Sequence, residues 1–406
     1  MRLRFHSSSF AFIAVLLSLS GAGCGGGSAA PSSPSGPSSS NPSSAVAVSI
    51  SPASANVPAG APQQFTAAVT GASNTAVSWE VNGDAGGNSA DGTITSAGLY
   101  TAPAAVPATP TVQVSAVSQA DTSKSAAASV TITHVRIGHV FLLVEENHGY
   151  SSVIGSSSMP YLNSLASQYG LATNYYANAH PSIGNYFMLT TGQLVNTDDT
   201  FTGTVTVDNL VRELLAAGKT WKSYAENLPS AGYTGGDVYP YLERHNPFSY
   251  FSHVRNSSVQ RQNLVPFTQF AADLTNAQLP DFSYIVPNAE HDAHDCPDGT
   301  QTCADSVKLS TADNWLKSNL GPLLSSSVFQ KDGLLVIVFD EAATSDTSHG
   351  GGHVAMLVVG PAARPAYQSS TFYQHQNTLR LLVDTSGAAA APGSSASASG
   401  MGEFLR

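Results

Sequence analysis

The chain has 406 residues, which is too many for one ordinary domain and predicts two or three units. It carries 16 Lys and Arg against 27 Asp and Glu, a formal net charge of −11, and a general nucleic-acid binder needs a basic surface, so that class is excluded. Hydrophobic residues make up 42% of the chain, too many for a chain that is disordered throughout. Three cysteines exclude a small scaffold built from disulfides.

Residues 1–24 have the pattern of an export signal. A basic start, Met1–Arg4, precedes the apolar run Phe10–Leu19, which is too short to span a bilayer, and small residues lead to Cys24. This ending resembles a bacterial lipobox, in which the cysteine is lipidated after cleavage; Gly21 stands where such motifs usually have Leu, so a plain cleaved signal is the alternative. We expect an exported protein: a membrane-anchored lipoprotein facing the periplasm or cell surface, or a secreted protein.

Residues 25–44 contain only Gly, Ser, Ala, Pro and Asn. No apolar group there can offset the entropy lost on ordering the chain, so the segment is predicted to be a disordered tether. A spacer directly after Cys24 supports the hypothesis of a lipid anchor in a membrane.

Residues 45–133 alternate apolar and polar side chains in short runs, such as Val46/Val48/Ile50, and turn residues separate these runs. The pattern predicts short strands in an antiparallel sandwich. Trp79 falls inside one run, and the segment resembles the bacterial immunoglobulin-like modules of surface proteins. It contains no histidine and no clustered acids, so we assign it a spacer or adhesion role without chemistry.

Residues 137–406 alternate apolar, strand-like runs with helical stretches, which predicts an α/β fold with a doubly wound, largely parallel sheet. The strand-like runs are apolar enough to be buried on both faces. We expect strands at Ile137–Val144, Phe282–Val286, Leu334–Phe339 and Val354–Val359, and helices at Met159–Tyr169, Asp208–Leu215 and Asp305–Leu324.

Acidic residues follow these strands. Glu145–His148 ends the first, Asn288–Asp295 follows the second, and Asp340–Glu341 ends the third. Ligands of open α/β sheets bind outside the carboxyl ends of the strands, so we expect the three clusters to meet there. Carboxylates that share a site repel one another, and a bound divalent cation resolves that repulsion.

The residue types leave the identity of this cation open. Oxygen ligands suit Ca²⁺, Mg²⁺ or Mn²⁺, whereas histidines also admit zinc or iron. Each feature alone also has an ordinary explanation, because acids cap helices and solvated strand ends, and histidines fill cores. The oxygen donors are Glu146, Asn147, Asp340 and Glu341, and the histidines are His291, His294, His349 and His353.

Ser182, in the segment Asn178–Tyr186, is the candidate nucleophile. A serine at the start of a helix has backbone N–H groups nearby to bind an anion, and a metal lowers the pKa of its hydroxyl. The alternative is a serine that only caps the helix or forms a turn next to Pro181.

Blocks of sequence in this region resemble bacterial secreted phosphoesterases, the acid phosphatases and phospholipase C-like enzymes related to the alkaline phosphatase superfamily. The resemblance covers residues 137–406. It implies an alkaline-phosphatase-like fold and the hydrolysis of phosphoric esters. The blocks are VEENHGY, PYLNSLA, ATNYYANAHPSIGNYFMLTTG, WKSYAENLP, YLERHNPFSYF, IVPNAEHDAHDC, DNWLKSNLGPLL, VFDEA and HQNTLRLL.

The resemblance also implies roles for single residues. Glu146 and Asn147 become metal ligands, with Asn147 also touching the phosphoryl group, and Ser182 becomes a metal-bound nucleophile. Asp340 and Glu341 close the metal site. Glu145 beside Glu146 leaves two acids to choose from, and we prefer Glu146 because it directly precedes Asn147.

Asp292, His294 and Asp295 match a D-x-H-D cluster that binds phosphate or a second metal. His180 and His353 join the site as further histidines, with His353 preferred as the late one because it precedes a strand. The mechanism implied is that of an acid phosphatase acting on phosphomonoesters through a phosphoserine, with a histidine such as His294 or His180 protonating the leaving group. Residues that could line the leaving-group side are Trp221, Tyr224, Arg244, His245 and Phe248.

Cys296 and Cys303 enclose a short loop, and in an exported protein this spacing favours a disulfide. It would hold the loop that carries Asp292 to Asp295. The alternative is thiolate ligation of a metal next to His294.

Other functions stay open at this point. A phospholipase C-like phosphodiesterase or a phosphoinositide phosphatase is the nearest variant, so the partner is a phosphorylated small molecule or lipid. A Ser-Asp-His esterase would use Ser182, Asp340 and His353 and leave Glu146 without a role. A surface adhesin is the non-enzymatic alternative.

Overall fold

The computed structural model describes residues 45–103, 106–107, 109–133 and 137–406. The predicted signal peptide, Cys24 and the 25–44 tether lie outside the described residues, so these assignments stay predictions. Within the described part of the chain, none of the helices combines the length and the apolar character needed to cross a bilayer.

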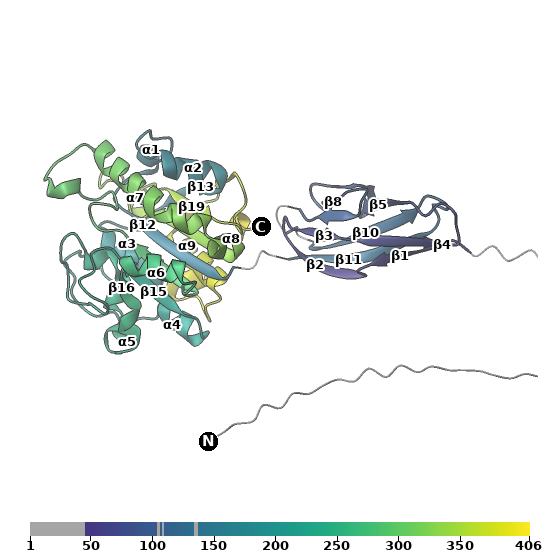
Figure 1. The fold of residues 1–406 in the computed structure, drawn as a ribbon. Coiled ribbons are helices and arrows are strands. Elements are labelled where there is room, and N and C mark those ends of the chain that lie inside the picture. The colour runs from purple at the N-terminus through teal and green to yellow at the C-terminus, as the bar shows by residue number, and fades with distance from the viewer. Residues whose placement is uncertain (1–44, 104–105, 108, 134–136) are drawn as a thin grey trace, which may run out of the picture. The chain divides into compact units, whose positions relative to one another are not determined.

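The region 45–133 consists of short strands, as the alternation predicts (Figure 1). β1 (Ala47–Ser51) pairs antiparallel with β4 (Thr66–Thr70). β2 and β11 are paired in parallel, whereas we expected an antiparallel arrangement. The alternation of residues carries no information on strand direction, so this pairing could not be predicted. A second sheet has the order β2 (Ser54–Pro58), β11 (Ser125–Thr133), β10 (Thr111–Ser118), β5 (Val77–Val81), β6 (Asp84–Ala85), and a third has the order β3 (Pro62–Gln64), β9 (Leu99–Thr101), β8 (Gly92–Ile94), β7 (Gly87–Asn88).

Trp79 lies in the middle of β5 and is buried in the core of this region. Phe65 and Tyr100 pack edge to face beside it in the same core, with ring centres 6.5 Å apart. This hydrophobic cluster is separate from the cluster of residues 140–404. The immunoglobulin-like assignment and the exact domain limits stay predictions.

The region 137–406 is built on a mixed, largely parallel sheet, and the α/β prediction is confirmed. Neighbouring strands are parallel from β16 to β18, whereas β19 runs antiparallel to both β18 and β13. Within the described residues the eight strands have the order β16 (Leu264–Pro266), β15 (Trp221–Ala225), β17 (Phe282–Val286), β12 (His139–Glu145), β18 (Gly333–Phe339), β19 (Met356–Val359), β13 (Gly170–Ala172), β20 (Tyr367–Ser369).

Helices cover both faces of the sheet (Figure 1). Every residue of β17 and β18 is therefore buried. One group packs α3 (Ser182–Thr191) and α4 (Leu210–Ala216) against α9 (His375–Ser386), which contacts β12. The other packs α2 (Pro160–Gln168), α7 (Asp305–Ser325) and α8 (Ser327–Asp332), with α8 against β18. The remaining elements are α1 (Tyr150–Val153), α5 (Ser252–Arg255), α6 (Thr268–Thr275), the strand pair β14 (Tyr175–Tyr176) and β21 (Tyr373–Gln374), and the 3₁₀ turns η1 (Glu243–His245), η2 (Pro247–Tyr250), η3 (Gln260–Asn263), η4 (Pro297–Gly299), η5 (Ser348–Gly350), η6 (Gly393–Ala396) and η7 (Gly402–Phe404).

The N-terminus of α2 is capped from another helix. Asp313 on α7 accepts hydrogen bonds from the backbone N–H groups of Tyr161 and Leu162, at 2.9 and 2.8 Å. Two of the helix's free donors are thereby satisfied, and the carboxylate lies at the positive end of the helix dipole. This contact fixes α2 against α7.

The carboxyl ends of the central strands meet at one edge of the sheet. Glu145 at the end of β12 is paired in register with Phe339 at the end of β18, and the Asp340 N–H donates to the Glu145 carbonyl. β17 ends at Val286, on the other side of β12. The three acidic segments therefore leave the sheet side by side, as expected for parallel strands.

Candidate active site

Glu146 is the centre of the candidate site. Its side chain is fully buried, and its Oε2 accepts hydrogen bonds from the Ser182 hydroxyl at 3.0 Å and the Asn147 amide at 2.8 Å. Its Oε1 accepts from the Tyr186 hydroxyl at 2.5 Å. Neighbouring Glu145 is also buried, yet neither of its carboxyl oxygens has a hydrogen-bond partner among the described residues. The structure thus places Glu146, and not Glu145, on the nucleophile candidate.

Asn147 turns the chain directly after Glu146. Its φ of 55° lies in the left-handed region, which asparagine tolerates better than most residues. In this conformation its backbone N–H donates to Asp340 Oδ1 at 3.1 Å. The turn therefore ties the segment after β12 to the segment after β18.

Ser182 is the first residue of α3, as the sequence predicts, and it is buried. The next N–H of the helix, that of Ile183, donates to Asp199 Oδ1 at 3.0 Å. The helix N-terminus carries partial positive charge, which suits an anionic phosphoryl group near the serine hydroxyl. Glu146 accepts the hydroxyl hydrogen, so the lone pairs of Oγ point away from that carboxylate.

Asp340 and Glu341 come directly after β18 and are both buried. Asp340 Oδ2 has no hydrogen-bond partner among the described residues. Glu341 lies 3.1 Å from His180 Nδ1 and 3.4 Å from the side-chain amide of Asn185 on α3. His180 thus joins the acids, as predicted.

His245 is a site residue whose central position sequence reasoning missed. It is buried between Glu146 Oε1, 3.2 Å from its Nε2, and Asp292 Oδ2, 2.9 Å from its Nδ1. Its ring stacks on Tyr186 with centres 5.2 Å apart. Only the contact from Nδ1 to Asp292 is a hydrogen bond, and Nε2 has no hydrogen-bond partner among the described residues. No local pattern around Glu243–His245 marks this bridge, which exists only in the folded chain.

Asp292 is buried, and its backbone carbonyl accepts the Glu146 N–H at 2.7 Å. His294 and Asp295 are more exposed and pair with each other, 2.7 Å from His294 Nδ1 to Asp295 Oδ1. The His294 ring centre lies 5.9 Å from that of His245. The D-x-H-D segment therefore reaches the site through Asp292 and His294, with Asp295 at its outer side.

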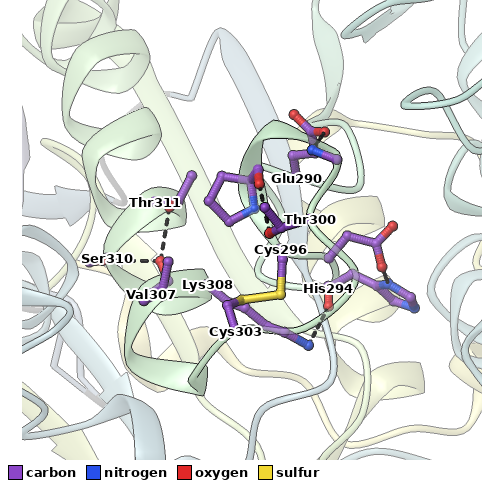
Figure 2. Close-up of a disulfide and its surroundings, with 12 residues drawn as sticks. Glu290, His294, Cys296, Thr300, Cys303, Val307, Lys308, Ser310 and Thr311 are labelled. Carbon is purple, nitrogen blue, oxygen red and sulfur yellow. Dashed lines mark hydrogen bonds and ion pairs between the residues drawn. A yellow bond between two sulfur atoms is a disulfide. The ribbon is translucent and has the colours of Figure 1, made fainter.

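Figure 2 shows the disulfide between Cys296 and Cys303, directly after this segment. The prediction of a disulfide is confirmed, and the alternative of thiolate ligation does not apply in the oxidised protein. A disulfide also suits an exported protein.

Within the described part of the chain, the His353 ring forms no hydrogen bond or ion pair with the carboxyl groups of the candidate site. Its Nε2 is 3.2 Å from the Thr173 carbonyl, and its ring stacks on Tyr150 and Tyr176 with centres 4.5 and 4.9 Å away. His375 on α9 is a later histidine that reaches this segment, and its Nε2 lies 2.6 Å from the backbone carbonyl of Asp340. A Ser182-Asp340-His353 triad is therefore not assembled.

The other residues expected on the leaving-group side divide into two sets. Trp221, Tyr224 and Phe248 are buried in the hydrophobic core. Arg244 is partly exposed and pairs with Asp237 at 2.9 Å. An aromatic residue next to a site motif can belong to the hydrophobic core or to a binding pocket. The sequence alone does not distinguish these two positions.

Burial dominates the electrostatics of the site. It raises the pKa of Glu146 well above its usual range, and the charges of Asp340 and Asp292 raise it further. Burial likewise raises the pKa of Asp340 to about 7 and, together with the charge of Asp340, that of Glu341 to about 9. The carboxylates therefore resist ionising together without a compensating positive charge.

The donor set fits a hard divalent cation. Asp340 Oδ2 is a buried, unpartnered oxygen, and the carboxyl groups with raised pKa values would be neutralised by a cation. Among the described residues, no three His, Cys, Asp or Glu side chains form a ready-made metal cage. The predicted ligand set differs from such a cage, because it also uses the side-chain oxygens of Asn147 and Ser182. The five predicted ligands are Glu146, Asn147, Ser182, Asp340 and Glu341.

Comparisons with known proteins identify the family of this chain. A model of the Phosphoesterase family matches residues 152–387. An acid phosphatase of Aspergillus fumigatus is 30% identical over 272 residues, 63% of this chain and 58% of the relative. A probable acid phosphatase of Kluyveromyces lactis is 30% identical over 248 residues, 59% of this chain and 56% of the relative. The chain thus spans little more than half the length of these two relatives.

A phosphatidylinositol-3-phosphatase of Mycobacterium tuberculosis is 32% identical over 249 residues, 60% of this chain and 75% of that protein. Among solved structures, a protein in the alkaline phosphatase superfamily from Vibrio parahaemolyticus aligns with a TM-score of 0.45 and 14% identity, over 63% of this chain and 68% of that one. The family match covers more than half of the sequence. The chain belongs to the phosphoesterase family.

Proposed function

We propose that the chain is a metal-dependent phosphoric ester hydrolase, an acid phosphatase that acts on phosphomonoesters. The observation that carries the proposal is the buried hydroxyl of Ser182 at the start of α3, hydrogen-bonded to Glu146 at the meeting point of the acidic segments. Family membership and the acid phosphatases among the relatives support the same reaction.

Ser182 is the proposed nucleophile. Its Oγ attacks phosphorus while its proton passes to Glu146, which accepts its hydrogen bond, and the alcohol leaves with a proton from a histidine. In a second in-line displacement, water attacks the phosphoserine and gives a proton to that histidine, and Ser182 Oγ leaves with the proton held by Glu146. Glu146 holds the hydroxyl in place through its 3.0 Å hydrogen bond. His294, which is more exposed than His245, is the proposed proton donor to the leaving group, and His180 orients Glu341.

Glu146, Asn147, Ser182, Asp340 and Glu341 are the proposed ligands of a divalent cation, Ca²⁺, Mg²⁺, Mn²⁺, Zn²⁺ or iron. Such a cation supplies positive charge that offsets the phosphoryl oxygens and lowers the pKa of the serine hydroxyl. The orphaned Asp340 Oδ2 and the raised pKa of Asp340 support this set.

His245 is proposed as a positioning residue. It touches Glu146 and Asp292 and so holds the acid after β12 against the segment after β17. Burial lowers its pKa well below the usual value, so it stays neutral and is a poor candidate for the leaving-group acid. Asp295 orients His294 in this role. The alternative assignment has Asp292 and His294 bind phosphate or a second cation, with His180 as the proton donor in place of His294.

A second candidate substrate class is the phosphoinositides, favoured by the phosphatidylinositol-3-phosphatase among the relatives. Export through a signal peptide, with Cys24 as a lipid anchor, remains part of the proposal and would place the enzyme at a membrane surface. The alternatives are a phospholipase C-like enzyme and an adhesin. The experiment below is designed to distinguish each of them from the proposed phosphatase.

The test compares hydrolysis of a chromogenic phosphomonoester with that of the matching phosphodiester, before and after chelation. We expect monoester turnover that chelation abolishes and that divalent cations, added back one at a time, restore. Diester turnover alone would replace the proposal with a phospholipase C-like enzyme. Turnover that resists chelation, with covalent labelling by a serine-esterase probe, would favour a triad enzyme, and no turnover of either ester would favour the adhesin.

A further inference from the structure

Tyr186 is a buried residue of α3 to which the proposed reaction gives no role. It lies four residues after Ser182, and residues four apart in a helix are on the same face. Its side chain is 1% exposed, and its hydroxyl donates to Glu146 Oε1 at 2.5 Å. A phenol, whose usual pKa is about 10, keeps its proton in neutral and acidic solution and stays a donor.

The helix α3 holds the Glu146 side chain at two points. The Ser182 hydroxyl donates to Oε2 at 3.0 Å, and the Tyr186 hydroxyl donates to Oε1, so each carboxyl oxygen is bonded to the same helix. Rotation of the carboxyl group about its last carbon–carbon bond would break both contacts together. Before the reaction, the serine therefore helps to hold the acid that receives its proton.

Phosphorylation of Ser182 removes one of these two contacts. When Oγ forms its bond to phosphorus, its proton passes to Glu146 Oε2, and Oγ has no hydrogen left to donate. Of the two hydrogen bonds from α3 to Glu146, only that of Tyr186 then remains. In the second displacement, water attacks phosphorus, the bond from phosphorus to Oγ breaks, and Oγ takes the proton back. This return requires the proton to be on Oε2, the oxygen that faces Ser182.

Two neighbours of Glu146 favour the proton on the other oxygen, Oε1. The side-chain amide of Asn147 donates to Oε2 at 2.8 Å, and an oxygen that accepts a hydrogen bond is a poorer place for a proton. On the other side, His245 Nε2 lies 3.2 Å from Oε1. Because the neutral His245 ring bonds to Asp292 through Nδ1, Nε2 carries the lone pair and can accept a proton from Oε1.

The Tyr186 hydroxyl opposes both of these effects. Its hydrogen bond to Oε1 is shorter than that of Asn147 to Oε2, 2.5 against 2.8 Å. A donor at Oε1 makes that oxygen the acceptor of the carboxyl group and leaves the proton on Oε2. The Tyr186 ring also stacks on the His245 ring, and a phenylalanine at this position keeps that contact while it removes the hydroxyl.

We infer that Tyr186 is a positioning residue for the second displacement, in which its hydroxyl keeps Glu146 Oε2 and the proton on it directed at Ser182 Oγ. The inference rests on the proposed phosphatase function and assigns Tyr186 to one half of that reaction, the hydrolysis of the phosphoserine.

The test compares Tyr186→Phe with the unmodified protein on phenyl phosphate, with the divalent cation that supports turnover. kcat should fall at least about tenfold, the lower end of the effect of losing a hydrogen bond to a charged group. kcat/KM reports the steps up to phosphorylation and should stay within about threefold, so KM should fall together with kcat. After acid quenching at saturating substrate, mass spectrometry of the peptide that carries Ser182 should find several times more phosphoserine in the variant.

Tyr373→Phe is the matched control. Tyr373 is also buried, and its hydroxyl donates at 2.7 Å to the carboxylate of Glu403, outside the candidate site. This variant should leave kcat, KM and the amount of phosphoserine unchanged. Each variant loses one hydrogen bond from a phenol to a carboxyl group, so both thermal midpoints should fall by only a few degrees. Phosphoserine is counted per folded chain, so a partly unfolded variant still gives an answer.

The outcomes separate the inference from the function beneath it. A lower kcat with more phosphoserine supports the role of Tyr186 in the second displacement. A merely structural role would lower kcat and kcat/KM equally, leave KM unchanged and add no phosphoserine, and this result would overturn the inference. Turnover without phosphoserine in either protein would overturn the covalent route and the inference with it. No turnover of phenyl phosphate by the unmodified protein would instead overturn the proposed function.

Discussion

The two β-containing regions of the chain bury very different residues. In the described part of 45–133, Ser118 is the only buried polar residue, and the core is aliphatic and aromatic. In 137–406 the buried set includes Glu145, Glu146, Asp340 and Glu341. Burying an unpaired charge is costly, and such groups persist where a function uses them. The need for a stable core therefore explains which residues are buried in 45–133. It does not explain the buried acids of 137–406.

Removing the nucleophile is the strongest test of this difference. Ser182→Ala should lower phosphomonoester turnover by at least about a thousandfold, because the covalent route is lost. The thermal midpoint should change by only a few degrees, since a hydroxyl is removed without opening a large cavity. Steady-state rates and a thermal melt of both proteins check this prediction.

Ser310→Ala serves as the control, because Ser310 lies on α7 and, among the described residues, its hydroxyl bonds only to the Val307 carbonyl. It should retain the rate of the unmodified protein. A Ser182→Ala enzyme that keeps near-normal turnover would remove Ser182 from the proposed mechanism.

Trp79→Ala tests the region that buries no charge. The side chain is 7% exposed, so its loss should destabilise the region 45–133 by about 3 to 5 kcal/mol. Chemical denaturation of the separate region would measure this change. Phosphatase activity of the full chain should stay within about twofold, since the sequence predicts no chemistry here.

Ser49→Ala, at an exposed position of β1, is the control and should change stability by less than about 0.5 kcal/mol. A loss of turnover in Trp79→Ala that matches its loss of stability would show that the two regions depend on each other.

The pH dependence of stability is a further test of the buried acids in 137–406. Asp340 has its pKa raised by burial to about 7, so it binds a proton in the folded state that it loses when the chain unfolds. The contribution of Asp340 to the free energy of unfolding is fully present below its unfolded pKa, about 3.9. It is lost as pH rises through the folded pKa, about 7. In chelator, the free energy of unfolding should therefore fall over this window, by about 4 kcal/mol from this residue, at about 1.36 kcal/mol for each pKa unit.

Asp340→Asn is the matched variant, because the amide keeps the shape of the side chain and cannot ionise. Denaturation at several pH values, in chelator, should show a smaller fall for Asp340→Asn than for the unmodified protein. Identical pH profiles for both proteins would contradict the raised pKa of Asp340. A saturating divalent cation should flatten the fall in the unmodified protein.

Local sequence pattern predicted the central strands, the main helices, the start of α3 at Ser182 and the acids at the strand ends. These features depend on residues adjacent in sequence: apolar runs, the breaks between them and the polar residues at their ends. The antiparallel direction of β19 was not predictable, because a short apolar run looks the same in either direction. The parallel pairing of β2 and β11 was missed for the same reason.

The histidines show where sequence reasoning fails. His353 was preferred because it precedes a strand, yet its ring packs between Tyr150 and Tyr176, whereas His375 touches Asp340 from a helix that begins later in the chain. His245 connects Glu146 and Asp292 across long sequence separations. Such contacts are set by tertiary packing and leave no local signal.

The burial of α3 has a further consequence. Every residue from Ser182 to Thr191 is buried, so the helix that carries the proposed nucleophile is held on all sides by its surroundings. A serine held in this way needs little reorganisation before it reacts, and substrate binding energy is not used to order it. An enzyme with such a nucleophile should tolerate very different alcohols on the phosphate, with selectivity among them set by the surface loops.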